Sequence, residues 1–151
     1  MGQDKVTDQE LAGLVGRMAE AASAFIRGDM RRYLELIHHA DDYTLMAPLG
    51  GEPRRGFDES DEAVEALAEF FRGEGEAELE VFESYRSGDL IVLVCIERQH
   101  GVVGGLPSQD LSLRVTLVFR RDGTDWQLVH RHADSLVNEI TIEQMLSIGR
   151  A

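Results

Sequence analysis

The first third of the chain carries apolar side chains at helical spacing. Thr7 and Glu10 form a capping-box pair, in which a hydroxyl and a carboxylate satisfy backbone amides at the start of a helix. Apolar residues then recur every three or four positions, and Gly28 suits the end of this helix. The pattern predicts a long helix and then a short second helix that ends at His38 and His39, where a positive imidazole suits the helix dipole.

The rest of the chain changes from helical to strand periodicity. The run YTLMA, closed by the turn signal PLGG, predicts a short strand, and apolar residues in 60–71 predict a third helix. From about residue 76 the apolar period becomes two, and turn residues divide the region into strands at 76–86, 89–100, 111–121 and 125–134. A last short helix is expected at about 141–149, because Thr141 and Gln144 form a second capping box.

Helices followed by a meander of antiparallel strands predict an α+β fold, and the 151 residues fit one domain covering 1–151. The helices can bury one face of such a sheet. The other face also carries apolar residues, among them Val115, Leu117 and Phe119, and it needs a second cover. We therefore expect a homodimer that pairs through the sheet.

The turns between the strands predict which side chains lie opposite each other. We pair the last two strands about the turn at 122–124 and the preceding hairpin about its 101–110 loop, which aligns polar residues across three strands. The aligned rows are Glu97–Arg114–His132 and Cys95–Thr116–His130. Because opposed residues share a face of the sheet, we expect these side chains to line the polar wall of a ligand pocket.

His130 and His132 are the main candidates for chemistry. An unperturbed imidazole titrates near neutral pH, so either ring can act as a general base, with Asp134 orienting His132. Arg114 can bind a carboxylate or stabilise an enolate oxygen through its planar guanidinium. The structural alternative is that both histidines hydrogen-bond Arg114, Thr116 or the backbone.

The neighbouring side chains also have two interpretations. Glu97 and Arg114 form either a structural ion pair or part of a ligand contact, because desolvation can cancel the Coulomb gain of a buried pair. Cys95 is either a thiolate nucleophile beside His130 or an inert core residue. A metal held by His130, His132 and Glu97 would be opposed by Arg114, so we expect no metal and no other cofactor.

The charge balance narrows the range of partners. Fifteen basic residues against 28 acidic residues give a net charge of −13 at pH 7, which repels phosphate backbones and anionic lipid. The sequence shows no apolar run long enough to span a membrane, no signal peptide and one cysteine, which excludes a disulfide framework. We expect a cytoplasmic protein that acts on a small organic molecule, with no nucleic acid and no membrane as partner.

The segment RVTLVFRRDGTDWQLVHRHAD resembles the closing hairpin of SnoaL-like proteins in the nuclear transport factor 2-like (NTF2-like) superfamily, which includes ketosteroid isomerase. Earlier segments follow the same order, up to the meander that begins near GDLIVLVCIER, and the resemblance spans about residues 7–137. It implies a cystatin-like cone, in which a curved antiparallel sheet wraps around the N-terminal helices. The open mouth of the cone would hold the small organic molecule.

The resemblance implies a small-molecule-binding protein, with cofactor-free acid–base catalysis (isomerisation, dehydration, cyclisation or hydrolysis) as its enzymatic form. In the ketosteroid isomerase pattern an aspartate base faces a tyrosine and a protonated acid. Here Tyr33 and Tyr43 are the candidate phenols, and neither lies in a motif that identifies the isomerase group. The alternative is a non-catalytic module that uses the same fold to bind a ligand or to dimerise.

Overall fold

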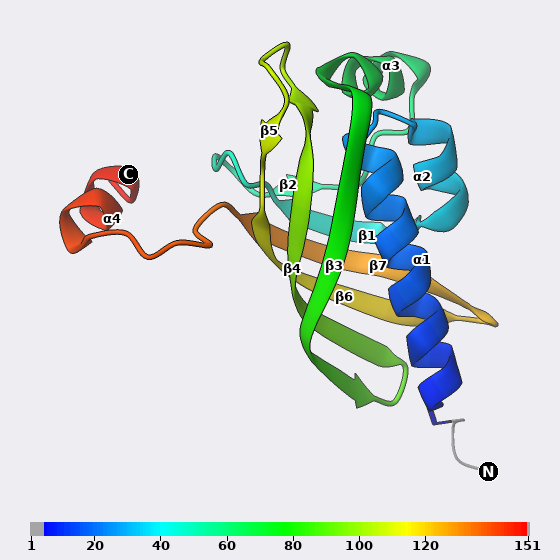
Figure 1. Ribbon diagram of the computed structural model, residues 1–151. Helices are drawn as coiled ribbons and strands as arrows, with labels where there is room; N and C mark the ends of the chain where they lie inside the picture. The colour runs from blue at the N-terminus through cyan, green and yellow to red at the C-terminus, as the bar shows by residue number, and fades with distance from the viewer. Residues whose placement is uncertain (1–4, 151) are drawn as a thin grey trace.

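The computed structural model describes residues 5–150 and shows the α+β fold expected from the sequence (Figure 1). The helices are α1 (Asp8–Ile26), α2 (Met30–Leu36), α3 (Asp61–Phe70) and α4 (Ile142–Ile148). The strands are β1 (His38–Met46), β2 (Arg54–Arg55), β3 (Phe71–Ser87), β4 (Leu90–Val103), β5 (Gln109–Asp110), β6 (Leu113–Asp122) and β7 (Asp125–Asp134). The sheet is strongly curved, and α1 lies along β3 within its curve (Figure 1).

The strands follow the spatial order β2-β1-β7-β6-β4-β3, and β5 pairs with β4. The long strands β3, β4, β6 and β7 form the antiparallel meander that the apolar alternation predicts. β1 runs parallel to β7, which differs from the wholly antiparallel sheet expected from the sequence. These two strands are separated in the chain by α3 and most of the meander, so packing rather than a hairpin turn decides their relative direction.

α1 begins at the predicted capping box. The Thr7 hydroxyl accepts from the Glu10 amide, and the Glu10 carboxylate accepts from the Thr7 amide. The buried side chains Leu14, Met18 and Ala21 form a stripe that belongs to the hydrophobic core with the inner face of the sheet. Apolar burial of this kind contributes about 25 cal/mol per Å² and holds the helix against the sheet.

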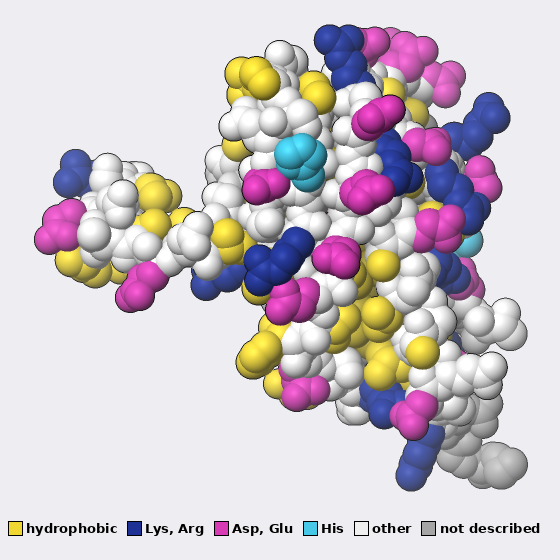
Figure 2. Space-filling view, viewed as in Figure 1, with side chains coloured by type: hydrophobic (Ala, Val, Ile, Leu, Met, Phe, Trp, Pro, Cys, Tyr) yellow, Lys and Arg dark blue, Asp and Glu magenta, His cyan; other side chains and the backbone are white. Residues whose placement is uncertain are grey.

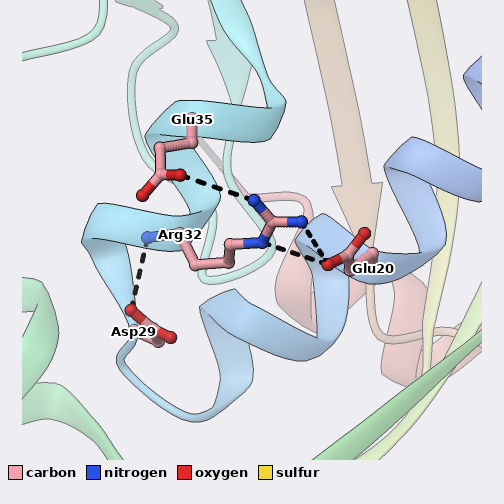
Figure 3. Close-up of polar contacts among 4 residues, drawn as sticks. All are labelled: Glu20, Asp29, Arg32 and Glu35. Atoms are coloured by element: carbon pink, nitrogen blue, oxygen red, sulfur yellow. Dashed lines mark hydrogen bonds and ion pairs between the residues drawn. The ribbon is translucent and has the colours of Figure 1, made fainter.

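An arginine on the helical surface connects α1 with α2 (Figure 3). The Arg32 guanidinium donates to Glu20 of α1 at 2.6 and 3.0 Å and to Glu35 of α2 at 3.4 Å. The Arg32 amide donates to Asp29, the N-cap of α2. All of these groups are exposed, so the network contributes little to stability and mainly orients the short helix.

His38 and His39 begin β1, so the prediction that they end the second helix is wrong. The helix ends at Leu36, and Ile37 already has an extended backbone, which suits its β-branched side chain. The register between β1 and β7 then shifts between His39 and Thr44, and in this irregular part the ring centroids of His39 and Tyr43 are 4.7 Å apart.

The pairing of β4 with β6 differs from the predicted register by one residue. Glu97 lies opposite Leu113 rather than Arg114, and Cys95 is displaced from Thr116 in the same way. The short strand β5 pairs with the end of β4, so the hairpin is not centred on its loop. Because successive side chains point to opposite faces, Glu97 and Cys95 lie on the inner face, whereas Arg114 and Thr116 lie on the outer face.

The pairing of β6 with β7 differs from the predicted register by one residue near the turn and by two residues from Val118 to Arg114. Arg114 lies opposite Asp134 rather than His132, and Thr116 lies opposite His132 rather than His130. A shift of two residues keeps each side chain on its face, so both histidines share the outer face with Arg114 and Thr116. The register also shifts within this pair, through a β-bulge that the sequence pattern does not reveal.

α4 lies apart from the sheet at the end of an extended connection (Figure 1). The capping box of Thr141 and Gln144, which the sequence predicts, is present at its start. Within residues 5–150, no helix combines the length and apolar character needed to cross a membrane.

Candidate functional site

The sheet divides the predicted site residues into two groups. The inner group, which lies in the core, consists of Cys95, Glu97, Tyr33 and Tyr43. The outer group, on the opposite face, consists of Arg114, Thr116, His130, His132 and Asp134. The expectation that Glu97 and Arg114 share one polar wall with the histidines is therefore wrong, because the sheet itself separates them. The expectation that Val115, Leu117 and Phe119 lie on the face away from the helices is also wrong, because all three are buried in the core on the inner face.

A buried ion pair lies on the inner face. Arg131 of β7 donates to both carboxylate oxygens of Glu97 of β4 at 2.7 and 2.8 Å, and the pair reaches across β6. Only 2% of Glu97 is exposed. Burial alone would lower the pKa of the Arg131 guanidinium, but the neighbouring carboxylate outweighs burial and raises that pKa, so the arginine stays charged.

Four rings gather on the same inner side. His39 stacks on Phe57 with ring centroids 4.0 Å apart and planes 4° from parallel. The centroids of the His39 and Tyr43 rings are 4.7 Å apart, and the two rings meet edge to face. The Tyr33 hydroxyl and Nε2 of His39 are 3.0 Å apart, which makes a hydrogen bond. We call His39, Phe57, Tyr33 and Tyr43 the ring cluster.

Burial keeps the ring cluster uncharged at neutral pH. It lowers the pKa of His39 to about 4, with smaller contributions from the charges of His38 and Arg131. It raises the pKa of Tyr43 to about 12 and also raises that of Tyr33, so both phenols keep their protons. If Tyr33 donates to Nε2, the imidazole proton is on Nδ1, a buried atom without a hydrogen-bond partner among the described residues.

We expect the neutral state of His39 to make stability depend on pH. The unfolded imidazole takes a proton near pH 6.5, whereas the folded one does so only near pH 4. The unfolded chain therefore binds more protons between these values, and the free energy of unfolding falls as pH falls through this window, by about 2–3 kcal/mol. Urea unfolding at pH 7, 5.5 and 4.5 should show this loss for the wild type and a smaller loss for His39→Phe; parallel losses would contradict it.

A groove of about 510 Å³ opens on the outer face. Its lining includes Phe82, Val94, Ile96, Arg114, Thr116, His132 and Asp134. Arg114 donates to both oxygens of Asp134 at 2.9 and 3.0 Å and holds the pKa of that carboxyl below its ordinary value. Asp134 is thus engaged by Arg114 instead of orienting His132, and His130 is hydrogen-bonded through Nδ1 to Thr44 at 2.8 Å.

The structure does not support the two remaining chemical alternatives, a cysteine nucleophile and a metal site. Burial, reinforced by the charge of Glu97, raises the pKa of the Cys95 thiol to about 12, so a thiolate nucleophile is not populated at neutral pH. Glu97 and the pair His130 and His132 point to opposite faces, so they do not form the metal site considered from the sequence. In the part of the chain that the structure describes, no three His, Cys, Asp or Glu side chains are grouped to hold a metal ion.

A serine, a histidine and an aspartate are hydrogen-bonded in line where β5 meets β4. Ser108 Oγ lies 2.9 Å from Nε2 of His100, and Nδ1 of His100 lies 2.9 Å from Asp110. Acyl-transfer triads have this order, but they hold a buried aspartate. Here 89% of the Asp110 side chain is exposed, so water competes for it, and we assign the row to stabilisation of the β4–β5 hairpin.

Three residues of the inner site were not predicted from the sequence: His39, Phe57 and Arg131. The helical pattern places His39 at a helix end, and Phe57 lies in an irregular segment without periodicity. Arg131 lies between two outward-facing histidines, and the bulge in the β6–β7 pair places its side chain inward beside Glu97. The available signal in the sequence is alternation along the strand, which places Arg131 on the face opposite His130 and His132.

The curved, open sheet around the N-terminal helices defines an NTF2-like protein with a cystatin-like fold. The SnoaL-like domain family matches residues 16–138, and the chain belongs to this family. That membership supports a small-molecule-binding domain. A comparison with the curated proteins finds no match.

Several solved structures are similar to this chain. An NTF2-like protein of unknown function from Pseudomonas putida KT2440 is 22% identical, with a TM-score of 0.68 over 95% of this chain and 94% of that chain. The CaMKII hub homology domain of Chlamydomonas reinhardtii is 16% identical, with a TM-score of 0.62 over 83% of this chain and 98% of that chain. An NTF2-like superfamily protein from Salmonella enterica is 17% identical, with a TM-score of 0.63 over 89% and 94%. Identities this low show the fold alone.

Proposed function

We propose that this protein binds a small, partly apolar, ring-containing organic molecule at the ring cluster of the inner face. The observation that carries the proposal is His39, a neutral imidazole with a stacked face and a buried Nδ1 that lacks a partner. A buried polar atom without a hydrogen bond costs about 1–3 kcal/mol, and a ligand oxygen that reaches it would remove this cost. Tyr33, Tyr43 and Glu97 stay part of the proposed binding site.

Phe57 provides the route by which a ligand reaches His39. It is half-buried and comes from the irregular segment between β2 and α3, whereas the other rings are held on α2 and β1. Gly56, directly before it, has a φ of +76°, a conformation that glycine adopts without strain. We propose that a planar ligand takes the position of Phe57 on the imidazole, with Phe57 displaced to cover it.

The protonation states favour binding over acid–base catalysis as the function. A general acid or base works best with a pKa near the operating pH. On the inner face the pKa of His39 is about 4, and those of Tyr43 and Cys95 are about 12. Catalysis by His130, His132 and Asp134 is not part of the proposal, because it depended on convergence with Glu97 in one pocket.

Titration with 2-naphthol, a planar apolar ring system with one hydroxyl, tests the proposed site through the fluorescence of the probe. We expect His39→Leu to weaken binding by about tenfold or more, because it removes the aromatic face on which the planar probe stacks. His132→Ala is the matched control on the outer face and should bind like the wild type. The proposal is wrong if His39→Leu binds 2-naphthol with wild-type affinity, or if His132→Ala abolishes binding.

A homodimer that pairs through the outer face of the sheet is the second part of the proposal. The outer face carries an open groove with apolar lining and exposed apolar neighbours, Phe82 at 83% and Tyr85 at 59%. Exposed apolar surface of this kind is typical of interaction sites. Light scattering should give about twice the chain mass of 16.8 kDa, and a mass of one chain would contradict the dimer.

A cytoplasmic location remains part of the proposal and accords with the buried free thiol of Cys95.

A further inference from the structure

α4 carries apolar side chains that the described chain leaves in solvent. Ile142, Met145, Leu146 and Ile148 are 51–70% exposed. Ile142, Met145 and Leu146 share a face, since they are three and four residues apart. Figure 2 shows hydrophobic side chains on this helix, away from the body of the molecule.

A helix of this length needs a packing partner. α4 has 7 residues, and isolated helices shorter than about 12–15 residues are marginal in water. Its capping box helps the first turn but does not bury the apolar face. The helix therefore calls for an apolar surface on another element or another molecule.

The outer groove offers a surface of matching character. Val94 and Ile96 contribute apolar lining, and Phe82 is projected at 83% exposure by the bulged part of β3. Asp134, the last residue of β7, also lines the groove, so the connection to α4 starts at the edge of the groove. The connection to α4 therefore begins next to the groove.

The charges at the groove favour contact with a second copy. A chain with a net charge of −13 repels itself over most of its surface. Around the outer groove, however, the acidic lining residues are paired with arginines, Glu80 with Arg98 and Asp134 with Arg114. Glu76 and Glu78 add negative charge farther along β3, outside the groove lining. α4 adds Glu143 and is followed by Arg150, which also balance.

We infer that α4 is an exchanged arm: in a dimer paired through the outer faces, the α4 helix of each copy lies in the outer groove of the other. A two-fold axis makes the two contacts identical. Each α4 starts at the edge of the groove in its own copy and binds the equivalent groove of the other copy. This inference rests on the dimer proposed above. Residues 135–141 extend to about 25 Å at most, which is also enough for α4 to fold onto its own groove, so the experiment must separate the two arrangements.

Nuclear magnetic resonance of mixed samples, with a spin label on one chain, distinguishes an exchanged α4 from an α4 folded onto its own groove. A nitroxide is attached to Met145→Cys in an unlabelled chain, which is then equilibrated with ¹⁵N-labelled wild-type chain. The native thiol of Cys95 is buried and has a pKa of about 12, so it should stay unlabelled at neutral pH. We expect broadening of the amides of Val94, Ile96 and Thr116 in the ¹⁵N chain, and a nitroxide on Leu49→Cys, 92% exposed between β1 and β2, should leave them sharp.

A control sample carries the nitroxide and ¹⁵N in the same chain and is diluted with unlabelled wild-type chain. Broadening of the groove amides in this sample alone would show that α4 folds onto its own groove, and it would overturn the exchange. The absence of broadening at the groove in both samples would also overturn it.

A second measurement compares two variants of α4 that add the same charge. Leu146→Glu places a carboxylate on the apolar face, and Ser147→Glu places one on the polar side of the helix. We expect Leu146→Glu to raise the dimer dissociation constant by about hundredfold or more, since both arms lose apolar burial, and Ser147→Glu to have little effect. If Leu146→Glu leaves the dimer dissociation constant unchanged, the exchanged arm is wrong but the proposed dimer stands. If the wild type is a monomer, both proposals are wrong.

Discussion

Replacing Arg131 with methionine should lower the free energy of unfolding by about 3–5 kcal/mol. The substitution keeps a long, flexible side chain but leaves the carboxylate of Glu97, which is 2% exposed, without its counter-charge. The Coulomb attraction and both hydrogen bonds to Arg131 are lost, and water cannot replace them in the core. Urea unfolding at pH 7 measures the loss.

The chain contains a matched control for this experiment. Arg114 makes the same two-fold contact with Asp134, but on the outer face, where the two side chains are 54% and 32% exposed. Arg114→Met should therefore cost at most about 1 kcal/mol, because water solvates the carboxylate that is left. The double variant Glu97→Gln/Arg131→Met should regain much of the loss of the single variant. Equal losses for Arg131→Met and Arg114→Met would show that burial does not govern the inner pair.

Replacing Gly28 with alanine should lower the free energy of unfolding by about 3 kcal/mol or more. Gly28 has a φ of +75°, in the left-handed region that costs other residues about 1–2 kcal/mol. A Cβ at this position would also lie 1.8 Å from the carbonyl oxygen of Phe71 and 2.9 Å from that of Ala68. Both clashes are with backbone, so α1 and α2 would have to separate from the junction of α3 and β3.

Gly13 in the middle of α1 gives the opposite expectation. A Cβ there meets nothing within 4 Å, and alanine is a better helix former than glycine by about 0.5–1 kcal/mol. Gly13→Ala should therefore raise the free energy of unfolding in the same urea experiment. If Gly28→Ala and Gly13→Ala change stability in the same direction, backbone strain at Gly28 is not the cause of its effect.

The elements predicted well are those whose signals are local. The capping boxes of Thr7 and Thr141 each involve residues three positions apart, and both are present in the structure. The four strands of the meander also lie close to their predicted ranges, because alternation of apolar and polar residues reports burial of one face of each strand separately. The resemblance of the closing hairpin to SnoaL-like proteins led to the family that the comparison confirms.

The candidate site was predicted less well because it depends on register. One residue of shift between β4 and β6 moved Glu97 to the face opposite Arg114, and no local feature of either strand specifies that shift. His39 illustrates the same limit. Its surroundings come from α2, β1 and the segment before α3, so neither its stacking nor its low pKa is visible in the sequence around it.

By itself, the sequence determined the order of the main helices and strands, the fold class and the acidic surface, because these depend on the order and chemistry of neighbouring residues. Only the tertiary structure decided which polar groups meet. Glu97 pairs with Arg131 rather than with Arg114, and His39 rather than His132 packs against the buried rings. The physical reason is that side chains alternate between the faces of a strand, so a single bulge or a one-residue shift, set by packing across the sheet, exchanges the partners of every charged residue on it.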